Sequence, residues 1–98
     1  MGEHYIKPED AVTLHGIFLE RVKRTPEGKA YCYFDTKRDA WLTLNWGEMH
    51  AQVARWQAAL RREHLEEGDR VAIMLRNCPQ WVMYEQAALS LGLVLVPL

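Results

Sequence analysis

Two short apolar runs near the end of the chain enclose a segment of helical length. The runs are Val71–Leu75 and Leu93–Leu98, and the segment between them is Gln80–Leu91. Nearly continuous apolar runs are typical of parallel strands that are buried on both faces. Because crossovers of this length are right-handed in almost all proteins, the pattern predicts a right-handed parallel βαβ unit in an internal sheet.

Turn-forming residues lie at both ends of these predicted elements. Gly68–Asp69 is a turn signal directly before the first run. Asn77 or Cys78 is placed to cap the helix, with Pro79 at the first helical position, where its missing N–H costs nothing. Gly92 then supplies a residue that readily adopts the left-handed conformation at the helix end.

The chain begins with a polar segment and a first helix. Residues 1–12 are largely polar and include Pro8, so they are predicted to form an extended lead-in. Thr13 is a candidate N-cap for a helix over Leu14–Arg24. The apolar residues that share one face of this helix are Leu14, Ile17, Phe18 and Val22.

A hairpin and a long helix are predicted next. Lys29–Phe34 and Trp41–Leu44 are rich in residues favoured in strands and are separated by a charged turn, which predicts an antiparallel β-hairpin. Asn45 and Glu48 have the spacing of a capping box, so the longest helix is predicted to begin here. Its apolar stripe consists of Trp46, Met49, Val53, Trp56 and Leu60.

Charge gives little indication of a partner. The 98 residues include 12 basic and 13 acidic side chains, so positive and negative charges almost cancel and no nucleic-acid partner is expected. The densest basic group, Arg21, Lys23 and Arg24, lies at the end of a predicted helix, where cations complement the helix dipole. A solvated face is therefore favoured over a phosphate-binding patch.

The cysteines and the apolar segments bear on the cellular compartment. Cys32 and Cys78 lie far apart and form no CxxC pair, which favours a reducing cytoplasm. The first residues lack a basic and then apolar leader, and no apolar run has the length needed to span a bilayer. A cytoplasmic location is expected, and peripheral contact with a membrane is left open.

The side chains that could carry chemistry do not form a recognisable site. No two of the histidines have zinc-ligand spacing, and none belongs to a Cys/His cluster. The histidines are His4, His15, His50 and His64. Cys78 lies near a helix N-terminus, where a thiol pKa can be lowered, but capping or packing is the favoured role.

Two further candidates are also interpreted as structural. The junction Leu75–Gln80 follows a strand, where α/β proteins often bind ligands, but it contains no glycine to form a phosphate cradle. The tryptophans are not interleaved with basic residues, so core or interface packing is favoured over base stacking. They are Trp41, Trp46, Trp56 and Trp81. The sequence therefore assigns no catalytic, cofactor-binding or metal-binding residue.

Several short motifs, in order along the chain, resemble the opening of the adenylate-forming superfamily, and within it long-chain acyl-CoA synthetases. The motifs are Thr13–Leu14, Phe18, Glu20–Arg21, Arg24–Pro26, Leu42–Thr43, Trp46–Glu48, Ala58–Leu60, Gly68–Ile73, Asn77–Trp81 and Gly92–Leu98. The segment Trp41–Trp46 favours the fatty-acid branch over amino-acid-activating and luciferase-like relatives. One departure is His64, at a helix exit where the family usually has glycine, so His64 must adopt a left-handed conformation or the helix must end differently.

The resemblance implies a two-step enzyme as the parent protein. A fatty-acid carboxylate attacks the α-phosphate of ATP with Mg²⁺ present to give an acyl-adenylate and pyrophosphate, and the thiol of CoA then displaces AMP from the acyl-adenylate. The family motifs for these steps lie downstream of Leu98, so no catalytic residue is carried over. Residues 13–98 are then the N-terminal part of a large AMP-binding domain, inactive alone, with the remainder of its own chain as a partner.

Alternatives remain open. The chain stops directly after an apolar strand, so we expect Leu98 to be a cut in a longer protein. A free-standing module that docks a protein partner through its apolar edge is the alternative from a different class. A fragment of an adenylating enzyme for another acid is a further alternative. Self-association of the isolated piece through its apolar edge is also expected.

Overall fold

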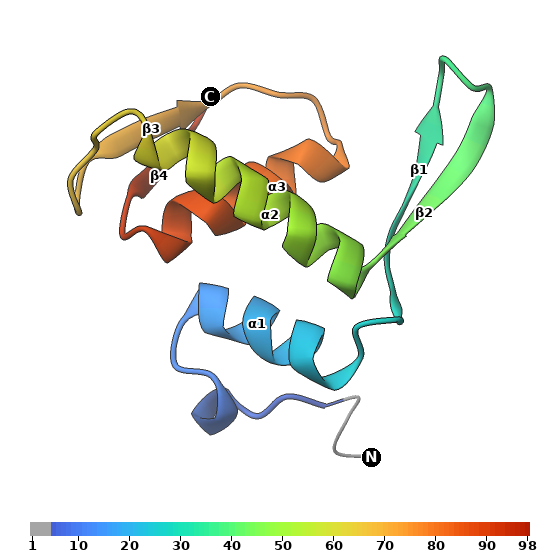
Figure 1. Ribbon diagram of the computed structural model, residues 1–98, viewed down its shortest axis with the longest axis horizontal. Helices are drawn as coiled ribbons and strands as arrows, with labels where there is room; N and C mark the ends of the chain where they lie inside the picture. Colours follow the sequence, from blue (N-terminus) through green and yellow to red (C-terminus); the bar gives the residue numbers. More distant parts are fainter. Residues whose placement is uncertain (1–4) are drawn as a thin grey trace. The chain divides into compact units, whose positions relative to one another are not determined.

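The computed structural model describes residues 5–98, which form a mixed α/β structure. The elements, shown in Figure 1, are η1 (Pro8–Asp10), α1 (Leu14–Arg24), β1 (Lys29–Asp35), β2 (Ala40–Asn45), α2 (Trp46–Arg61), β3 (Arg70–Ile73), α3 (Pro79–Ser90) and β4 (Val94–Pro97). The chain divides into two compact units, Met1–His50 and Ala51–Leu98, and α2 contributes to both. The predicted order of helix, hairpin, helix and βαβ unit is confirmed.

Helix α1 has the predicted bounds and the predicted cap. Thr13 is extended, with φ −123° and ψ 166°, and its Oγ1 accepts a hydrogen bond from the backbone N–H of Gly16 at 2.9 Å. This bond satisfies one of the N–H groups that lack a partner in the first turn of a helix. The helix ends before Thr25, whose N–H donates to the carbonyl of Arg21 at 3.0 Å.

The prediction of an extended lead-in is wrong for the residues just before α1. Pro8–Asp10 form a short 3₁₀ helix, in which the N–H of Asp10 donates to the carbonyl of Lys7 at 2.9 Å. The fixed φ of proline suits the first position of such a turn. The Asp10 carboxylate also accepts the N–H of Lys7 at 3.3 Å and so closes the turn.

Strands β1 and β2 form the predicted antiparallel hairpin. Phe34 lies opposite Trp41, and their rings make an edge-to-face contact with centroids 5.5 Å apart. In the turn, Asp35 Oδ1 accepts the N–H of Lys37 at 2.9 Å, as is typical of turns initiated by aspartate. Asp39 completes the turn with a left-handed φ of 52°.

Helix α2 begins with the predicted capping box. The N–H of Glu48 donates to Asn45 Oδ1 at 2.7 Å, and the N–H of Asn45 donates to Glu48 Oε1 at 2.8 Å. Of the predicted apolar stripe, Met49, Val53 and Leu60 are buried, while the two tryptophans are half-buried. Three residues beyond the helix, His64 has φ 55°, so the left-handed alternative expected at this exit is the one adopted.

The predicted parallel βαβ unit forms in Ala51–Leu98. Along the β3–β4 ladder the N–H of Val94 donates to the carbonyl of Asp69 at 2.8 Å, and the N–H of Leu98 donates to that of Ile73 at 2.9 Å. Pro79 occupies the first turn of α3, and Gly92 follows the helix with φ 72°. Within this unit α2 meets α3, because Gln57 Nε2 donates to Ser90 Oγ at 2.7 Å.

The prediction that both faces of this sheet are buried is wrong within the described residues. Ile73 is 3% exposed, whereas Val94 and Val96 on β4 are 47% and 38% exposed. The sheet has two strands, and α3 packs against β4, so one layer of helix leaves the other face of the sheet accessible. The apolar residues on that face are what made the strands look internal in the sequence.

We expect Gly92→Ala to destabilise the chain. A left-handed φ costs a non-glycine residue about 1–2 kcal/mol, and a Cβ at this position would also be only 2.6 Å from Cγ of Glu67. The free energy of unfolding, measured with urea, should fall by more than the left-handed cost alone.

Gly68→Ala is the matched control for this prediction. Gly68 has φ 91°, but an added Cβ would meet nothing within 4 Å, so its substitution carries the backbone cost without the clash. Adding Glu67→Ala should remove the extra loss at Gly92. Equal effects of the two glycine substitutions would show that the Glu67 contact does not matter.

We expect His64→Gly to stabilise the chain slightly. The change removes the energetic penalty of a left-handed non-glycine residue, about 1–2 kcal/mol. Glycine also makes the unfolded chain more flexible, which lowers the free energy of unfolding by roughly 0.5–1 kcal/mol. A net gain on the order of 0.5 kcal/mol should appear in urea unfolding. Glu63→Gly, at a neighbouring residue without a positive φ, should instead destabilise; the reverse order would contradict this account.

Candidate functional site

Two of the candidate histidines lie against one aromatic ring. His15 stacks on Phe18 with ring centroids 6.0 Å apart, and the ring of His50 lies 6.5 Å from the same ring. His64 is exposed at the exit of α2, and His4 lies outside the described residues. Across residues 5–98, no group of three or more His, Cys, Asp or Glu is placed to hold a metal ion. Of the three described histidines, His15 and His50 therefore have an aromatic packing partner.

The junction between β3 and α3 is largely exposed. Arg76 and Asn77 are exposed, and Cys78 is half-buried at the N-cap with an extended backbone and no side-chain cap hydrogen bond. Pro79 is buried directly after it. Of the two caps left open by the sequence, the structure uses Cys78.

The tryptophans differ in their surroundings. Trp46 packs edge-on against Phe18 and Tyr31, with centroids 6.1 and 6.3 Å apart. Trp56 packs against Tyr84 at 5.5 Å. Trp41 is 70% exposed on the hairpin. The sequence favoured core or interface packing for the tryptophans; core packing describes Trp46 and Trp56, whereas Trp41 is exposed.

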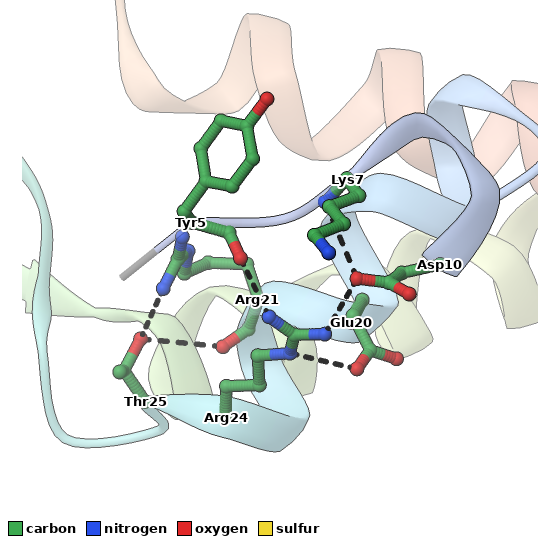
Figure 2. Close-up of polar contacts among 7 residues, drawn as sticks. All are labelled: Tyr5, Lys7, Asp10, Glu20, Arg21, Arg24 and Thr25. Atoms are coloured by element: carbon green, nitrogen blue, oxygen red, sulfur yellow. Dashed lines mark hydrogen bonds and ion pairs between the residues drawn. The ribbon is translucent and has the colours of Figure 1, made fainter. Parts of the chain in front are cut away.

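A cluster of polar contacts is centred on Arg24, shown in Figure 2. Its Nη1 donates to the backbone carbonyl of Tyr5 at 2.7 Å, and its Nη2 donates to Asp10 Oδ2 at 3.0 Å. Its Nε donates to Glu20 Oε1 at 2.9 Å. The planar guanidinium thus joins the segment before α1 to α1 itself.

The interpretation of the basic group as a solvated face is wrong for Arg24. Lys23 is exposed as expected, whereas the Arg24 side chain is 21% exposed and held by two carboxylates. Sequence reasoning had one signal available, because Glu20 and Arg24 have the i,i+4 spacing of a helix ion pair. Asp10 and Tyr5 lie too far away in sequence for any local pattern to show their contact with Arg24.

The cluster also perturbs the titration of its members. The hydrogen bond from Arg24 holds the pKa of Asp10 below its ordinary value of 3.8, and the backbone N–H of Lys7 acts in the same direction. The hydrogen bond to Glu20 in turn raises the pKa of Arg24, and that to Asp10 adds to it. Because the chain's own carboxylates and carbonyl engage Arg24, we interpret this cluster as a structural junction.

Comparison with known proteins identifies the class to which this fold belongs. The family described as AMP-binding enzyme matches residues 18–98. The chain therefore belongs to the AMP-binding enzyme family, and the resemblance stated from the motifs is confirmed.

Relatives of known name include CoA ligases. A Humulus lupulus protein named as a CoA ligase, CCL6, is 34% identical over 82% of this chain and 12% of its own length. Long chain acyl-CoA synthetase 1 of Arabidopsis thaliana is 29% identical over 100% of this chain and 16% of its own length. A Mycobacterium tuberculosis protein named as a fatty-acid–CoA ligase, fadD25, is 33% identical over 88% of this chain and 15% of its own length. The chain thus spans between 12% and 16% of the length of these relatives.

Solved structures of adenylating enzymes share the fold. A Mycobacterium tuberculosis fatty acyl CoA synthetase has a TM-score of 0.74 at 22% identity, over 95% of this chain and 17% of that chain. The N-terminal subdomain of Klebsiella oxytoca NpsA has a TM-score of 0.74 at 28% identity, over 87% of this chain and 21% of that chain. Bacillus subtilis o-succinylbenzoate CoA synthetase, in complex with ATP and magnesium ion, has a TM-score of 0.72 at 30% identity, over 83% and 20%.

We expect the contribution of Asp10 to stability to disappear in acid. Because the folded-state pKa of Asp10 is lowered, its contribution is present above the ordinary pKa of 3.8 and is lost as the pH falls through the folded value. The difference in unfolding free energy between the natural chain and Asp10→Asn should therefore be largest near about pH 6 and shrink on acidification.

Glu9→Gln is the control, because Glu9 is an exposed carboxylate in the same short turn. Its difference from the natural chain should be smaller than that of Asp10→Asn across the pH range. A difference for Asp10→Asn that grows as the pH falls would contradict the assigned ion pair.

Proposed function

We propose that this chain is the N-terminal structural part of an ATP-dependent long-chain fatty-acid–CoA ligase. The observation that carries the proposal is the family match over residues 18–98, together with relatives named as acyl-CoA synthetases and CoA ligases. In this proposal residues 13–98 are the N-terminal part of a larger AMP-binding domain, residues 1–12 lead into it, and the protein continues beyond Leu98.

The parent enzyme would join a fatty acid to CoA in two steps. The carboxylate displaces pyrophosphate from ATP and forms an acyl-adenylate, and the CoA thiol then displaces AMP to give the thioester. A requirement of the parent for ATP and Mg²⁺ is supported by the related o-succinylbenzoate CoA synthetase in complex with both. We assign no catalytic, cofactor-binding or metal-binding residue to this chain, which would be inactive by itself.

The role proposed for the chain is that of a scaffold. Val94 and Val96 leave one face of the β3–β4 sheet accessible, and exposed Met74 and Leu75 follow β3. Burying side chains of this size is worth about 1.5–3 kcal/mol each, so a further layer of the parent protein would gain stability by covering them. The remainder of its own chain is therefore the partner that we propose for this face.

A different carboxylic acid is the second candidate substrate. Structures related at 26–30% identity include NpsA, which has been solved in complex with anthranilyl-AMSN, and the o-succinylbenzoate synthetase. These identities are close to the 29% and 31% of two relatives named for long-chain fatty acids. A free-standing interaction module remains the alternative outside enzymes, with the same exposed apolar face as its docking surface.

A cytoplasmic location of the parent is also proposed. Both cysteines are free, with Cys32 exposed and Cys78 half-buried, as is usual in a reducing compartment. None of the helices in the described part of the chain has the length and apolar character required to cross a membrane. Peripheral contact with a membrane, which would bring the parent close to fatty acids, is the alternative.

The proposal is tested by the parent protein and this chain in parallel. We expect the parent to catalyse ATP–pyrophosphate exchange that depends on palmitate, and the 98-residue chain to catalyse none. Anthranilate, o-succinylbenzoate and acetoacetate would serve as competing acids in the same assay. Exchange that depends on one of these acids would move the assignment to another branch of the family.

The length of the endogenous protein is the matching control. Mass spectrometry of the endogenous protein should find peptides from beyond Leu98. A product that ends at Leu98, or a longer parent that is inactive with every acid, would contradict the proposed ligase and favour the interaction module.

A further inference from the structure

The segment Tyr5–Ala11, which we call the strap, folds back along α1 and is held there by Arg24. Figure 2 shows the guanidinium between the strap and the helix, with Tyr5 and Asp10 on the strap side and Glu20 on the helix side. Two of the three bonds described above therefore connect segments that lie 14 and 19 residues apart in sequence.

A single carboxylate oxygen takes part both in the 3₁₀ turn of the strap and in the bond that holds the strap against α1. Asp10 Oδ2 accepts the N–H of Lys7 at 3.3 Å and the Nη2 of Arg24 at 3.0 Å. The first bond closes the 3₁₀ turn of Pro8–Asp10, and the second fastens that turn to α1. Loss of Arg24 would therefore leave the turn with only its internal bonds, which are the 3.3 Å bond from Lys7 N–H to this carboxylate and the backbone bonds donated by Asp10 and Ala11.

Apolar burial contributes little to holding the strap. Ala11 is its one buried side chain, Ile6 is half-buried, and the remaining side chains of the strap are exposed. Ala11 fits against Gly16, where an added Cβ would lie 3.6 Å from that of Ala11. Segments with few buried apolar contacts and with exposed hydrogen bonds open locally at a small fraction of the global unfolding free energy.

We infer that the strap opens and closes on α1 as a local unit. Arg24, which we call the catch because it holds the strap against α1, sets the ratio of the closed to the open form. Opening separates Asp10 and the Tyr5 carbonyl from Arg24, uncovers α1 at Gly16, and leaves the cap of α1 at Thr13 intact. Because the ion pair is accessible to solvent, added salt weakens the closed form. This device is independent of the proposed enzyme activity and belongs to the chain itself.

Amide hydrogen exchange measured by NMR on the 98-residue chain tests the inference. The N–H groups of Asp10 and Ala11 donate to carbonyls within the strap and report its closure, and Ile17 and Thr25 report α1. We expect Arg24→Gln to lower protection of the strap amides about tenfold and to leave the α1 amides within about twofold. Arg24→Lys, which keeps the charge but lacks the planar fork, should lose most of the same protection.

Two charge-neutralising variants separate the catch from general effects. Lys23→Gln removes the same charge from an exposed neighbour on α1 and should leave strap protection unchanged. Glu20→Gln removes the ion pair within α1 but not the bonds to Tyr5 and Asp10, so it should change strap protection much less than Arg24→Gln.

Three outcomes would overturn the inference. Strap amides that are unprotected in the natural chain would show that the closed form is not populated. Unchanged strap protection in Arg24→Gln would show that Arg24 is not the catch. An equal loss of protection in the strap and in α1 would show that the strap does not open as a local unit.

Discussion

Helix α2 is the element on which the described fold depends, because it contributes buried side chains to both compact units. Met49 is 0% exposed in the first unit, and Val53 and Leu60 are 1% and 8% exposed in the second. Each such burial is worth roughly 1.5–3 kcal/mol. The reciprocal bonds of Asn45 and Glu48 fix the residue at which the helix begins, so local hydrogen bonding determines which side chains form the buried stripe.

Much of the fold follows from signals of this local kind. Thr13 and Asn45 mark two helix starts, Gly92 ends the third helix, and the charged turn after β1 defines the hairpin. Each of these features involves residues within about four positions of one another, so a sequence pattern can contain the whole cause. The parallel pairing of β3 and β4 was also predictable, because one helix of suitable length separates two apolar runs.

The features that the sequence did not reveal depend on contacts between distant segments. Pro8 suggested an extended lead-in, but the carboxylate of Asp10 closes a turn there and meets Arg24 fourteen residues further on. The burial of β4 was overestimated. Its apolar composition shows that the strand is suited to burial, but it does not show whether a neighbouring element is present to cover it. His15 and His50 have no sequence relationship, yet the structure places both against Phe18.

The residues through which the chain resembles its family serve mainly to shape the backbone. Thr13 caps α1, Arg24 fastens the strap, and Gly92 allows a left-handed turn close to Glu67. NpsA and the o-succinylbenzoate synthetase share this fold with TM-scores of 0.74 and 0.72, although the NpsA complex with anthranilyl-AMSN and the name of the synthetase indicate acids other than fatty acids. Caps and left-handed turns of this kind act on the backbone, so one fold is compatible with proteins named for different acids.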